Sequence, residues 1–400
     1  MEAALEGIKV LDLTTYLGGA AVSMYLGDFG AEVVKVEPPE GDRVRAMRTN
    51  AFLGKNSPPY MVLNRNKKGI VLDLTKPQGK EIALKLAKGS DVIVEDHKPG
   101  IIEGLGLGYE AVRAINARII YCSIPPFGKT GPYSDLAPND LIVKGMTGLM
   151  MKPEPGPYVT MDWLLGELPV GVLAAHGIAM ALLVREETGV GQLIETSCLS
   201  AMWPQLHYLS TLPLRDPVPP RAPPGVAWTY CYYQTKDGAF AVTTFTERHW
   251  ERLCKICGFE DLLNDKATYG SQAKRNDMKE TLRTVFAAKY REWTTEETLK
   301  KHIEAGVPCS EVNRWWQLFD HPQFREQGFF AKVEHPAVGE TEILGCPMSM
   351  TETPSSIRSP APMLGQHTEE VLAGLGYSPA QIEELRRQGV VQGALPSKIG

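Results

Sequence analysis

The stretch Met161-Asp162-Trp163-Leu164-Leu165-Gly166 places a single carboxylate between a Pro-containing segment and a long apolar run. The run continues to Leu183 and predicts a helix, so Asp162 stands just before the expected first turn. There its oxygens can accept the free N–H groups of the helix N-terminus, and the helix dipole stabilises the ionised carboxylate. An ionised Asp in a cleft can also be a covalent nucleophile. Helix capping and catalysis therefore both stay open for Asp162.

Two further segments carry side chains suited to an anionic ligand. The basic stretch Asn64-Arg65-Asn66-Lys67-Lys68-Gly69 is either a solvated hairpin tip or an anion site, because Lys and Arg beside turn N–H groups suit phosphates. The stretch Glu95-Asp96-His97-Lys98-Pro99-Gly100 follows a predicted buried strand. Ligands of open α/β sheets bind at the carboxyl ends of the strands, so this stretch is a candidate ligand contact.

Three other patterns favour structural roles. Gly104-Leu105-Gly106-Leu107-Gly108 lacks the spacing of a dinucleotide loop, so we interpret it as a turn between short helices. Cys254 and Cys257 lie in a helical pattern, and no second pair of ligands occurs at zinc-site spacing. Because a structural zinc site needs four ligands, we interpret both cysteines as structural. No Gly-x-Ser-x-Gly sequence occurs, which argues against an α/β-hydrolase triad. Since His97 also lacks a partner at metal-ligand spacing, no metal site is predicted.

Strand and helix patterns alternate along the first part of the chain. Helical patterns at residues 20–28 and 78–88 separate short runs rich in Val and Ile. Such alternation predicts βαβ units, a mostly parallel, doubly wound sheet and thus an α/β fold class. The predicted strands are residues 9–14, 31–37, 69–75, 91–96, 119–124 and 191–197.

Changes of composition divide the chain into domains. Residues 1–203 form the predicted large domain, and 204–226 an interdomain linker, because its prolines favour extended backbone and exclude helix. Residues 227–330 form a predicted smaller α+β domain that begins with a hairpin turning at Lys236-Asp237-Gly238. Residues 331–400 are a second linker and a return to the large domain, ending in a helix with Ser378 as cap and Pro379 at its first position.

Composition excludes several classes of partner. The 400 residues are 43% hydrophobic and 22% charged, as in soluble globular proteins. A net charge of −5 gives no reason to expect nucleic acid or an anionic membrane. The long apolar run is interrupted by Glu167, Pro169 and His176, so we interpret it as a buried helix and not a membrane span. Seven dispersed cysteines and the absence of a secretory leader predict a cytoplasmic protein.

Taken in order, several motifs resemble the class III CoA-transferase family, which includes formyl-CoA and carnitine CoA-transferases. Examples are Leu26-Gly27-Asp28-Phe29-Gly30 and Phe127-Gly128-Lys129-Thr130-Gly131-Pro132. Each motif alone is weak, but together they extend over nearly the whole chain. The resembling segments are residues 26–38, 66–74, 94–100, 127–133, 181–192, 306–309, 320–323 and 362–368.

The resemblance implies a fold and a set of site residues. Each monomer would be a ring with a Rossmann-like large domain and a small domain, and two rings would interlock as a dimer. The family's nucleophilic Asp corresponds to Asp162, and the resemblance implies a substrate pocket at Asn139 and Asp140. It also implies that CoA enters and leaves as part of a thioester substrate, without a metal or a tightly held cofactor. The implied CoA contacts are Tyr16, Leu17, Leu72, Asp96, His97, Lys98 and Leu105.

The implied chemistry exchanges a thioester between two acids. A carboxylate attacks an acyl-CoA donor, for which succinyl-CoA is a candidate, and forms an acyl-aspartyl anhydride. Returning CoA converts the anhydride into an aspartyl thioester that the acceptor acid attacks, so one hard step becomes several easier ones. Backbone N–H groups near Leu17-Gly18-Gly19 are candidate donors to the oxyanions.

This chain departs from the formyl-CoA transferases at several positions. Leu17 stands where they have Gln, and Asn139 where they have Tyr. The glycine run of their active-site loop is missing between residues 224 and 250. These departures argue against a formyl or oxalate substrate. Gly104 replaces an Arg that binds CoA phosphates in many members, so Lys98 or the stretch 64–68 is expected to supply that charge.

Three alternatives stay open beside intermolecular transfer. The first is intramolecular transfer of CoA between the two carboxylates of one diacid. The second is an acyl-CoA racemase, which is disfavoured because Asn139 stands where racemases have a His base. The third is a subunit of a hetero-oligomer of two homologues.

Overall fold

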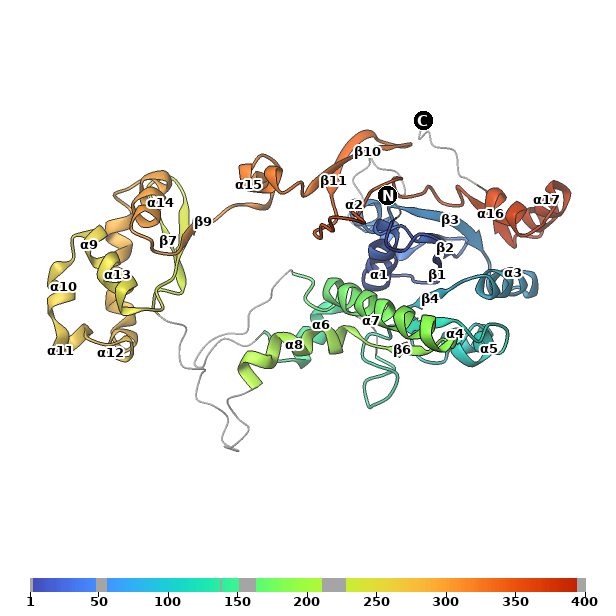
Figure 1. Cartoon of the computed structure of the whole chain (residues 1–400), viewed down its shortest axis with the longest axis horizontal. Coiled ribbons are helices and arrows are strands. Elements are labelled where there is room, and N and C mark those ends of the chain that lie inside the picture. Colours follow the sequence, from blue (N-terminus) through green and yellow to red (C-terminus); the bar gives the residue numbers. More distant parts are fainter. Residues whose placement is uncertain (1–2, 48–55, 137–138, 151–162, 211–227, 394–400) are drawn as a thin grey trace. The chain divides into compact units, whose positions relative to one another are not determined.

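The structure is a computed structural model that describes residues 3–47, 56–136, 139–150, 163–210 and 228–393, and the side chains of these except 206–210. Asp162 and most of the expected linker 204–226 lie outside the described residues. The chain divides into two compact units, drawn in Figure 1. The first unit takes in Met1–Met150, Val159–Tyr208 and Gln323–Gly400, and the second takes in Met151–Tyr158 and Leu209–Pro322.

The first unit is built on a seven-stranded sheet with the order β12-β3-β2-β1-β4-β5-β6. Six strands are parallel, and the short β12 is antiparallel to β3. The six parallel strands have the order of a Rossmann sheet, so the predicted doubly wound α/β architecture is confirmed. The strands are β1 Lys9–Asp12, β2 Glu32–Glu37, β3 Lys67–Leu72, β4 Val92–Glu95, β5 Ile120–Ser123, β6 Leu193–Glu195 and β12 Val391–Gln392.

Helices cover both faces of this sheet, because side chains that alternate along each strand point to opposite faces. Val10 and Val94 pack under α1 and α7, whereas Leu11 and Ile93 pack on the opposite face with α3, α16 and α17. The helices of the first unit are α1 Leu17–Asp28, η1 Arg43–Ala46, α2 Pro58–Leu63, α3 Pro77–Lys88, α4 Ile101–Gly104, α5 Tyr109–Arg113, α6 Asp140–Met146, α7 Glu167–Thr188, α8 Cys198–Ser210, α15 Pro322–Glu326, α16 Thr368–Gly374 and α17 Pro379–Arg387.

Helix α7 begins later than the sequence predicts. Its first residue is Glu167 and its N-cap is Gly166, so Asp162 precedes the cap position by four residues. The capping acceptor comes instead from α6, where the Asp140 carboxylate accepts hydrogen bonds from the N–H groups of Gly166 at 2.8 Å and Glu167 at 3.0 Å. The predicted helix start directly after Asp162 is therefore wrong: Gly166 holds the N-cap position, and the tertiary fold brings an acid from another helix to the helix end.

Helix α7 lies against α1, and the two helices approach closely (Figure 1). A Cβ atom on Gly171 would lie 2.6 Å from the Cβ of Ala21, so the contact requires a glycine there. The buried stripe of α7 includes Val170, Ala174 and Ile178.

By length and composition alone, α7 is the one helix among the described residues that could cross a membrane, and 39% of its most apolar window is buried within the structure.

Helix α8 corrects the expected start of the first linker. It runs to Ser210 and contains Pro204, although the prolines from residue 204 onward were expected to exclude helix. A proline inside a helix costs about 3 kcal/mol. Packing of the preceding turns, through Cys198, Ala201 and Met202, into the core of the first unit explains why the helix tolerates it.

The basic stretch at residues 64–69 is neither a solvated tip nor an anion site. Arg65 is 1% exposed, and its guanidinium binds the buried Asp28 carboxylate with a shortest N–O distance of 2.6 Å. Lys67 is 2% exposed and lies 3.0 Å from the Asp12 carboxylate. Internal carboxylates that the sequence pattern did not reveal already neutralise both cations. Lys68 is partly exposed, but its ammonium is paired with Glu32 and Glu370. This stretch therefore has no free charge for a CoA phosphate.

The C-terminal segment joins the large sheet through the same polar cluster. The Asn66 side chain binds Asp28, donates to the carbonyl of Ser356 at 2.9 Å and accepts the N–H of Arg358 at 2.6 Å. Strand β12 then pairs with β3. The predicted cap of the last helix is confirmed, since Ser378 caps α17 and Pro379 is its first residue.

The second unit has a three-stranded antiparallel sheet, β7-β8-β9, packed against helices. Its core is aromatic, with Trp228, Phe240 and Phe286 fully buried. The predicted hairpin is confirmed as β7 and β8. Cys254 and Cys257 are buried free thiols of α9, and no metal-type cluster occurs among the described residues. The elements are β7 Cys231–Gln234, β8 Ala239–Val242, α9 Glu247–Cys257, α10 Glu260–Asn264, α11 Lys266–Tyr269, α12 Gln272–Asp277, α13 Lys279–Tyr290, α14 Thr295–Glu304, β9 Cys309–Glu311 and η3 Trp315–Phe319; the hairpin β10 Phe330–His335 and β11 Gly339–Leu344 belongs to the first unit.

The buried Asp28–Arg65 pair generates a stability prediction. Asp28→Asn leaves the Arg65 guanidinium buried without its counter-charge, so we expect the free energy of unfolding to fall by about 3–5 kcal/mol. Glu32→Gln is the matched control, because the Glu32–Lys68 pair is half-exposed, and we expect it to cost less than about 1 kcal/mol. Urea unfolding followed by circular dichroism measures both variants. Equal, small effects would contradict the inferred role of the buried pair.

Candidate active site

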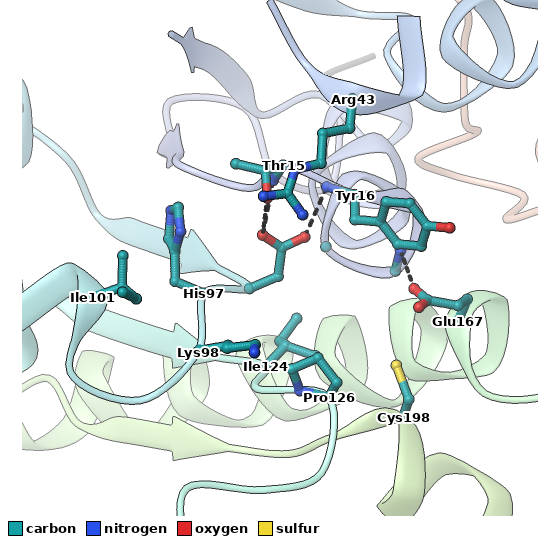
Figure 2. Close-up of a pocket in the computed structure, with 13 residues that line it drawn as sticks. Thr15, Tyr16, Arg43, His97, Lys98, Ile101, Ile124, Pro126, Glu167 and Cys198 are labelled. Carbon is teal, nitrogen blue, oxygen red and sulfur yellow. Dashed lines mark hydrogen bonds between the residues drawn. The ribbon is translucent and has the colours of Figure 1, made fainter. Parts of the chain in front are cut away.

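A cavity of about 310 Å³ opens at the carboxyl ends of β1 and β4. This is the switch point of the sheet, where the chain order reverses and where open α/β sheets bind ligands. Figure 2 shows the side chains converging on it from the β1–α1 and β4–α4 loops, α7 and α8. The lining residues are Thr15, Tyr16, Gly18, Gly19, Arg43, Asp96, His97, Lys98, Ile101, Ile124, Pro126, Glu167 and Cys198.

Four of the predicted CoA-contacting residues meet in this cavity. Tyr16 comes from the loop after β1, and Asp96, His97 and Lys98 follow β4. The carboxyl ends of neighbouring parallel strands lie at one edge of the sheet, which is why residues about 80 positions apart in sequence are neighbours here.

The other predicted site residues do not line this cavity. Leu17 is buried beside Tyr60, Leu72 is fully buried in the core, and Leu105 is partly buried against the same core as Leu72. Asn139 is exposed and caps α6 by accepting the N–H of Leu141, whereas Asp140 binds the start of α7. Asp162 lies outside the described residues.

Asp96 fixes the loop between β1 and α1. Its two carboxylate oxygens accept the N–H groups of Thr15 at 2.8 Å and Tyr16 at 3.0 Å. Burial raises the pKa of Asp96, and the nearby His97 opposes that shift. Both oxygens are thus engaged in holding backbone, so Asp96 positions the loop that forms one wall of the cavity.

His97 and Lys98 are anchored through their neighbours. The Glu95 carboxylate accepts the N–H of His97 at 2.8 Å, and the His97 Nε2 atom lies 3.0 Å from the carbonyl oxygen of Leu13. Burial raises the pKa of Glu95 to about 7. The Lys98 ammonium donates to the carbonyl of Asp135 at 3.0 Å and lies beside the cavity.

Glu167 is the functional candidate that sequence reasoning missed. The pattern presented it only as an interruption of an apolar helix, yet it lines the cavity and is 4% exposed. Its Oε2 atom accepts the N–H of Gly18 at 3.0 Å (Figure 2). The available signal was an acid at the start of an otherwise apolar run, because glutamates are rarely buried without a partner or a purpose.

Several charges act on the Glu167 carboxyl. Burial, together with the negative charges of Asp96 and Asp140, raises its pKa to about 7, although the N–H of Gly18 opposes the shift. The neighbouring Cys198 thiol also forms a hydrogen bond with Glu167, and burial keeps the pKa of that thiol above its usual range. The site therefore holds a carboxyl group that changes its charge near neutral pH.

Two glycines make room for the two cavity carboxylates. A Cβ atom on Gly18 would lie 2.9 Å from Oε2 of Glu167, and one on Gly19 would lie 2.9 Å from Oδ2 of Asp96. Both glycines belong to the first turn of α1, whose N–H groups have no partner within the helix. The arrangement places a buried carboxylate against a helix N-terminus, which suits chemistry that develops negative charge on oxygen.

A comparison with models of protein families identifies the family of this chain. Residues 5–368 match the model of CoA-transferase family III. The chain belongs to CoA-transferase family III. The family resemblance expected from the sequence motifs is thereby confirmed.

Relatives of similar length lie within this family. The chain is 34% identical to the human succinyl-CoA:glutarate CoA-transferase over 97% of its length and 90% of that protein. It is 33% identical to the succinyl-CoA:mesaconate CoA-transferase of Haloarcula hispanica, over 95% of its length and 99% of that protein. A CAIB/BAIF family protein from Brucella suis has a similar structure, with a TM-score of 0.84 and 27% identity over 94% of this chain and all of that one.

The glycine at position 18 generates a prediction about packing. In Gly18→Ala the new methyl group meets Val170, the Glu167 carboxylate and the Glu167 carbonyl oxygen at 2.8–3.0 Å. We expect this overpacking to lower the free energy of unfolding by about 1–3 kcal/mol. Gly374→Ala in α16 is the control, because nothing lies within 4 Å of its Cβ position. Denaturant unfolding of the two variants measures the difference, and an unaffected Gly18→Ala protein would contradict the close approach.

Proposed function

We propose that this chain transfers CoA from an acyl-CoA donor to a carboxylic acid. The observation that carries the proposal is the cavity at the sheet switch point, where the buried Glu167 carboxylate meets the N-terminus of α1. Membership of CoA-transferase family III supports the reaction class. The cavity supplies what thioester exchange requires, namely an enzyme carboxylate and N–H donors for oxyanions.

The proposed mechanism keeps the acyl group on the enzyme between donor and acceptor. An enzyme carboxylate attacks the thioester carbonyl, the C–S bond breaks, and CoA leaves as thiolate. The thiolate then attacks the enzyme's acyl carbon, which releases the donor acid and leaves an enzyme–CoA thioester. The acceptor acid repeats both steps in reverse order, so no net proton or electron is exchanged. Two residues are candidates for the carboxylate: Asp162, which the family resemblance assigns, and Glu167, which lines the cavity.

We infer dicarboxylic substrates, with succinyl-CoA as donor. Both relatives described above carry succinyl-CoA in their names and a diacid as acceptor. Arg43 and Lys98 bring two positive charges to the cavity, which suits a second carboxylate or the phosphates of CoA. The missing glycine run and the residues Leu17 and Asn139 argue against two particular substrates, formyl-CoA and the two-carbon diacid oxalate.

We propose that CoA binds along the loop after β4, where Asp96, His97 and Lys98 lie, and beside Tyr16. The carboxyl ends of β1 and β4 are the expected ligand edge of such a sheet. In this proposal CoA is carried in and out by the substrates, the enzyme holds no tightly bound cofactor, and it acts in the cytoplasm.

We propose further that two chains form an interlocked dimer. Helix α7 supports this assembly, because one whole side of it presents large apolar side chains to solvent, and such surfaces mark interfaces. Leu183 is 71% exposed and Val172 is 55% exposed. The large exposed apolar residues of α7 are Leu168, Val172, Leu173, Met180, Leu183 and Val184.

The function is tested by direct exchange. We expect the purified protein to convert succinyl-CoA and a five-carbon diacid into succinate and the new acyl-CoA, with much slower transfer to the monoacid of equal chain length. Mass spectrometry of the CoA products, with acetyl-CoA as the alternative donor, measures this. Strict dependence on added acid separates transfer from the intramolecular and racemase alternatives, which both need only one acyl-CoA. Absence of exchange with every donor and acid would refute the proposal.

The assembly is tested by dilution. Interlocked chains share their cores and cannot separate without unfolding, so we expect particles of two 44.0 kDa chains even at nanomolar concentration. Mass photometry measures the particle mass directly. Folded single chains would rule out interlocking, and a second type of chain that co-purifies in equal amount would instead indicate a hetero-oligomer.

A further inference from the structure

We propose that Glu167, and not Asp162, is the carboxylate that carries the acyl group in this chain. The inference rests on the proposed CoA transfer and names the residue that performs it. Glu167 is the first residue of α7, lines the cavity and is almost fully buried. Asp162 precedes the helix by five residues and was assigned from sequence alone.

The other carboxylates in or near the described cavity already bind backbone N–H groups. Asp96 and Glu167 are the carboxylates that line it. Both Asp96 oxygens accept N–H groups of the β1–α1 loop, and attack by either oxygen would release that loop. Asp140 is likewise occupied, since it holds the N-terminus of α7 and lies 3.2 Å from the Lys144 ammonium. Glu167 receives one backbone N–H and one thiol, both of which orient a nucleophile without neutralising its charge.

The position of Glu167 also supplies oxyanion donors. Its Oε2 atom accepts the N–H of Gly18 at 3.0 Å, which leaves the N–H of Gly19, the next residue in the first turn of α1, as the donor for an oxyanion. When the Glu167 oxygen attacks, negative charge develops on the substrate's carbonyl oxygen next to this turn. Backbone N–H groups at a helix N-terminus stabilise such charge without having to reorganise. Gly18 is required because a Cβ atom there would meet the same carboxylate.

The chemical step balances at Glu167. One carboxylate oxygen forms a bond to the acyl carbon, the C–S bond breaks, and its electron pair leaves on the CoA sulfur. The product is a mixed anhydride on the side chain of residue 167. CoA thiolate then attacks the δ-carbon of Glu167, the anhydride C–O bond breaks, and the donor acid departs as a carboxylate. A γ-glutamyl-CoA thioester remains for the acceptor.

Ionisation sets the pH at which this residue can act. The groups that face Glu167 are Tyr16, Asp96, Asp140 and Cys198, and the acids among them oppose its negative charge. Burial and these charges raise the pKa of Glu167 to about 7. An acid with a raised pKa is protonated, and thus non-nucleophilic, below that value. Transfer is therefore expected to rise with pH through about 7 and then level off.

Trapping on the wild-type protein locates the acyl group. The enzyme is incubated with succinyl-CoA, the thioester is reduced with borohydride, and the protein is digested with trypsin. Asp162 and Glu167 fall in one tryptic peptide, residues 145–185, so fragment ions must assign the modified residue. We expect modification at Glu167. Modification at Asp162 would overturn the inference while leaving the proposed CoA transfer intact.

Matched variants test the same point independently. Glu167→Gln keeps the size and an acceptor for the Gly18 N–H, and we expect exchange to fall by more than about 1,000-fold with the fold retained. Glu167→Asp withdraws the carboxylate by one methylene, so we expect a loss of about 100-fold with trapping still at residue 167. Asp162→Asn should retain exchange within a few-fold. An active Glu167→Gln protein, or an inactive Asp162→Asn protein with a normal circular dichroism spectrum, would overturn the inference.

The pH profile separates a nucleophile from a structural residue. Asp140→Asn removes a charge that raises the pKa of Glu167 but keeps an oxygen for the N–H groups of Gly166 and Glu167. We expect the acidic limb of the rate profile to move to lower pH in this variant. An unchanged limb would argue that another group controls the step. If the wild-type protein transfers no CoA at all, the proposed function fails instead.

Discussion

The close approach of α7 to α1 is the constraint on which the site depends. Gly171 lets the helices touch at Ala21, and Gly18 leaves space for the first residue of α7. Any larger side chain at either position would separate the helices or displace the Glu167 carboxylate. Because both helices begin at this end of the contact, the buried Glu167 carboxylate comes within hydrogen-bond distance of the Gly18 N–H, which has no partner within its own helix. Packing and site geometry are therefore two consequences of one helix pair.

A buried polar network holds the strands and loops around that helix pair. Asp12 at the end of β1 binds Lys67, and Lys35 bridges from β2 to the carbonyl of Thr14 at 2.9 Å. Burial alone would raise the pKa of Asp12, but the two lysines hold it below its usual range. At the other end of α1, the buried Asp28 carboxylate forms an ion pair with Arg65. Charges that the sequence presents as surface features thus fix the backbone that leads into the cavity.

The electrostatics of the cavity follow from carboxylates that serve different purposes. Asp96 and Asp140 hold backbone N–H groups, one at the β1–α1 loop and the other at α7. Their negative charges act on Glu167, which lies between the elements they hold. The same acids that position the site therefore keep its central carboxyl close to its ionisation point. Arg43 and Lys98 at the cavity add the opposite charge needed to admit anionic substrates.

Local sequence patterns were sufficient to predict most strands, the start of the last helix and the family. Apolar runs predicted the parallel strands, and the Ser378-Pro379 pair predicted the start of α17. Motifs in a fixed order predicted CoA-transferase family III. Each of these signals depends only on residues that are close together in the chain. The loop with Asp96, His97 and Lys98 was also predicted, since the carboxyl ends of parallel strands bind ligands. Only the tertiary structure showed that residues 64–67 are neutralised internally, that Asp140 caps α7 and that Glu167 enters the cavity. Each of these depends on contacts between residues tens of positions apart, and no local pattern records which acid meets which helix end.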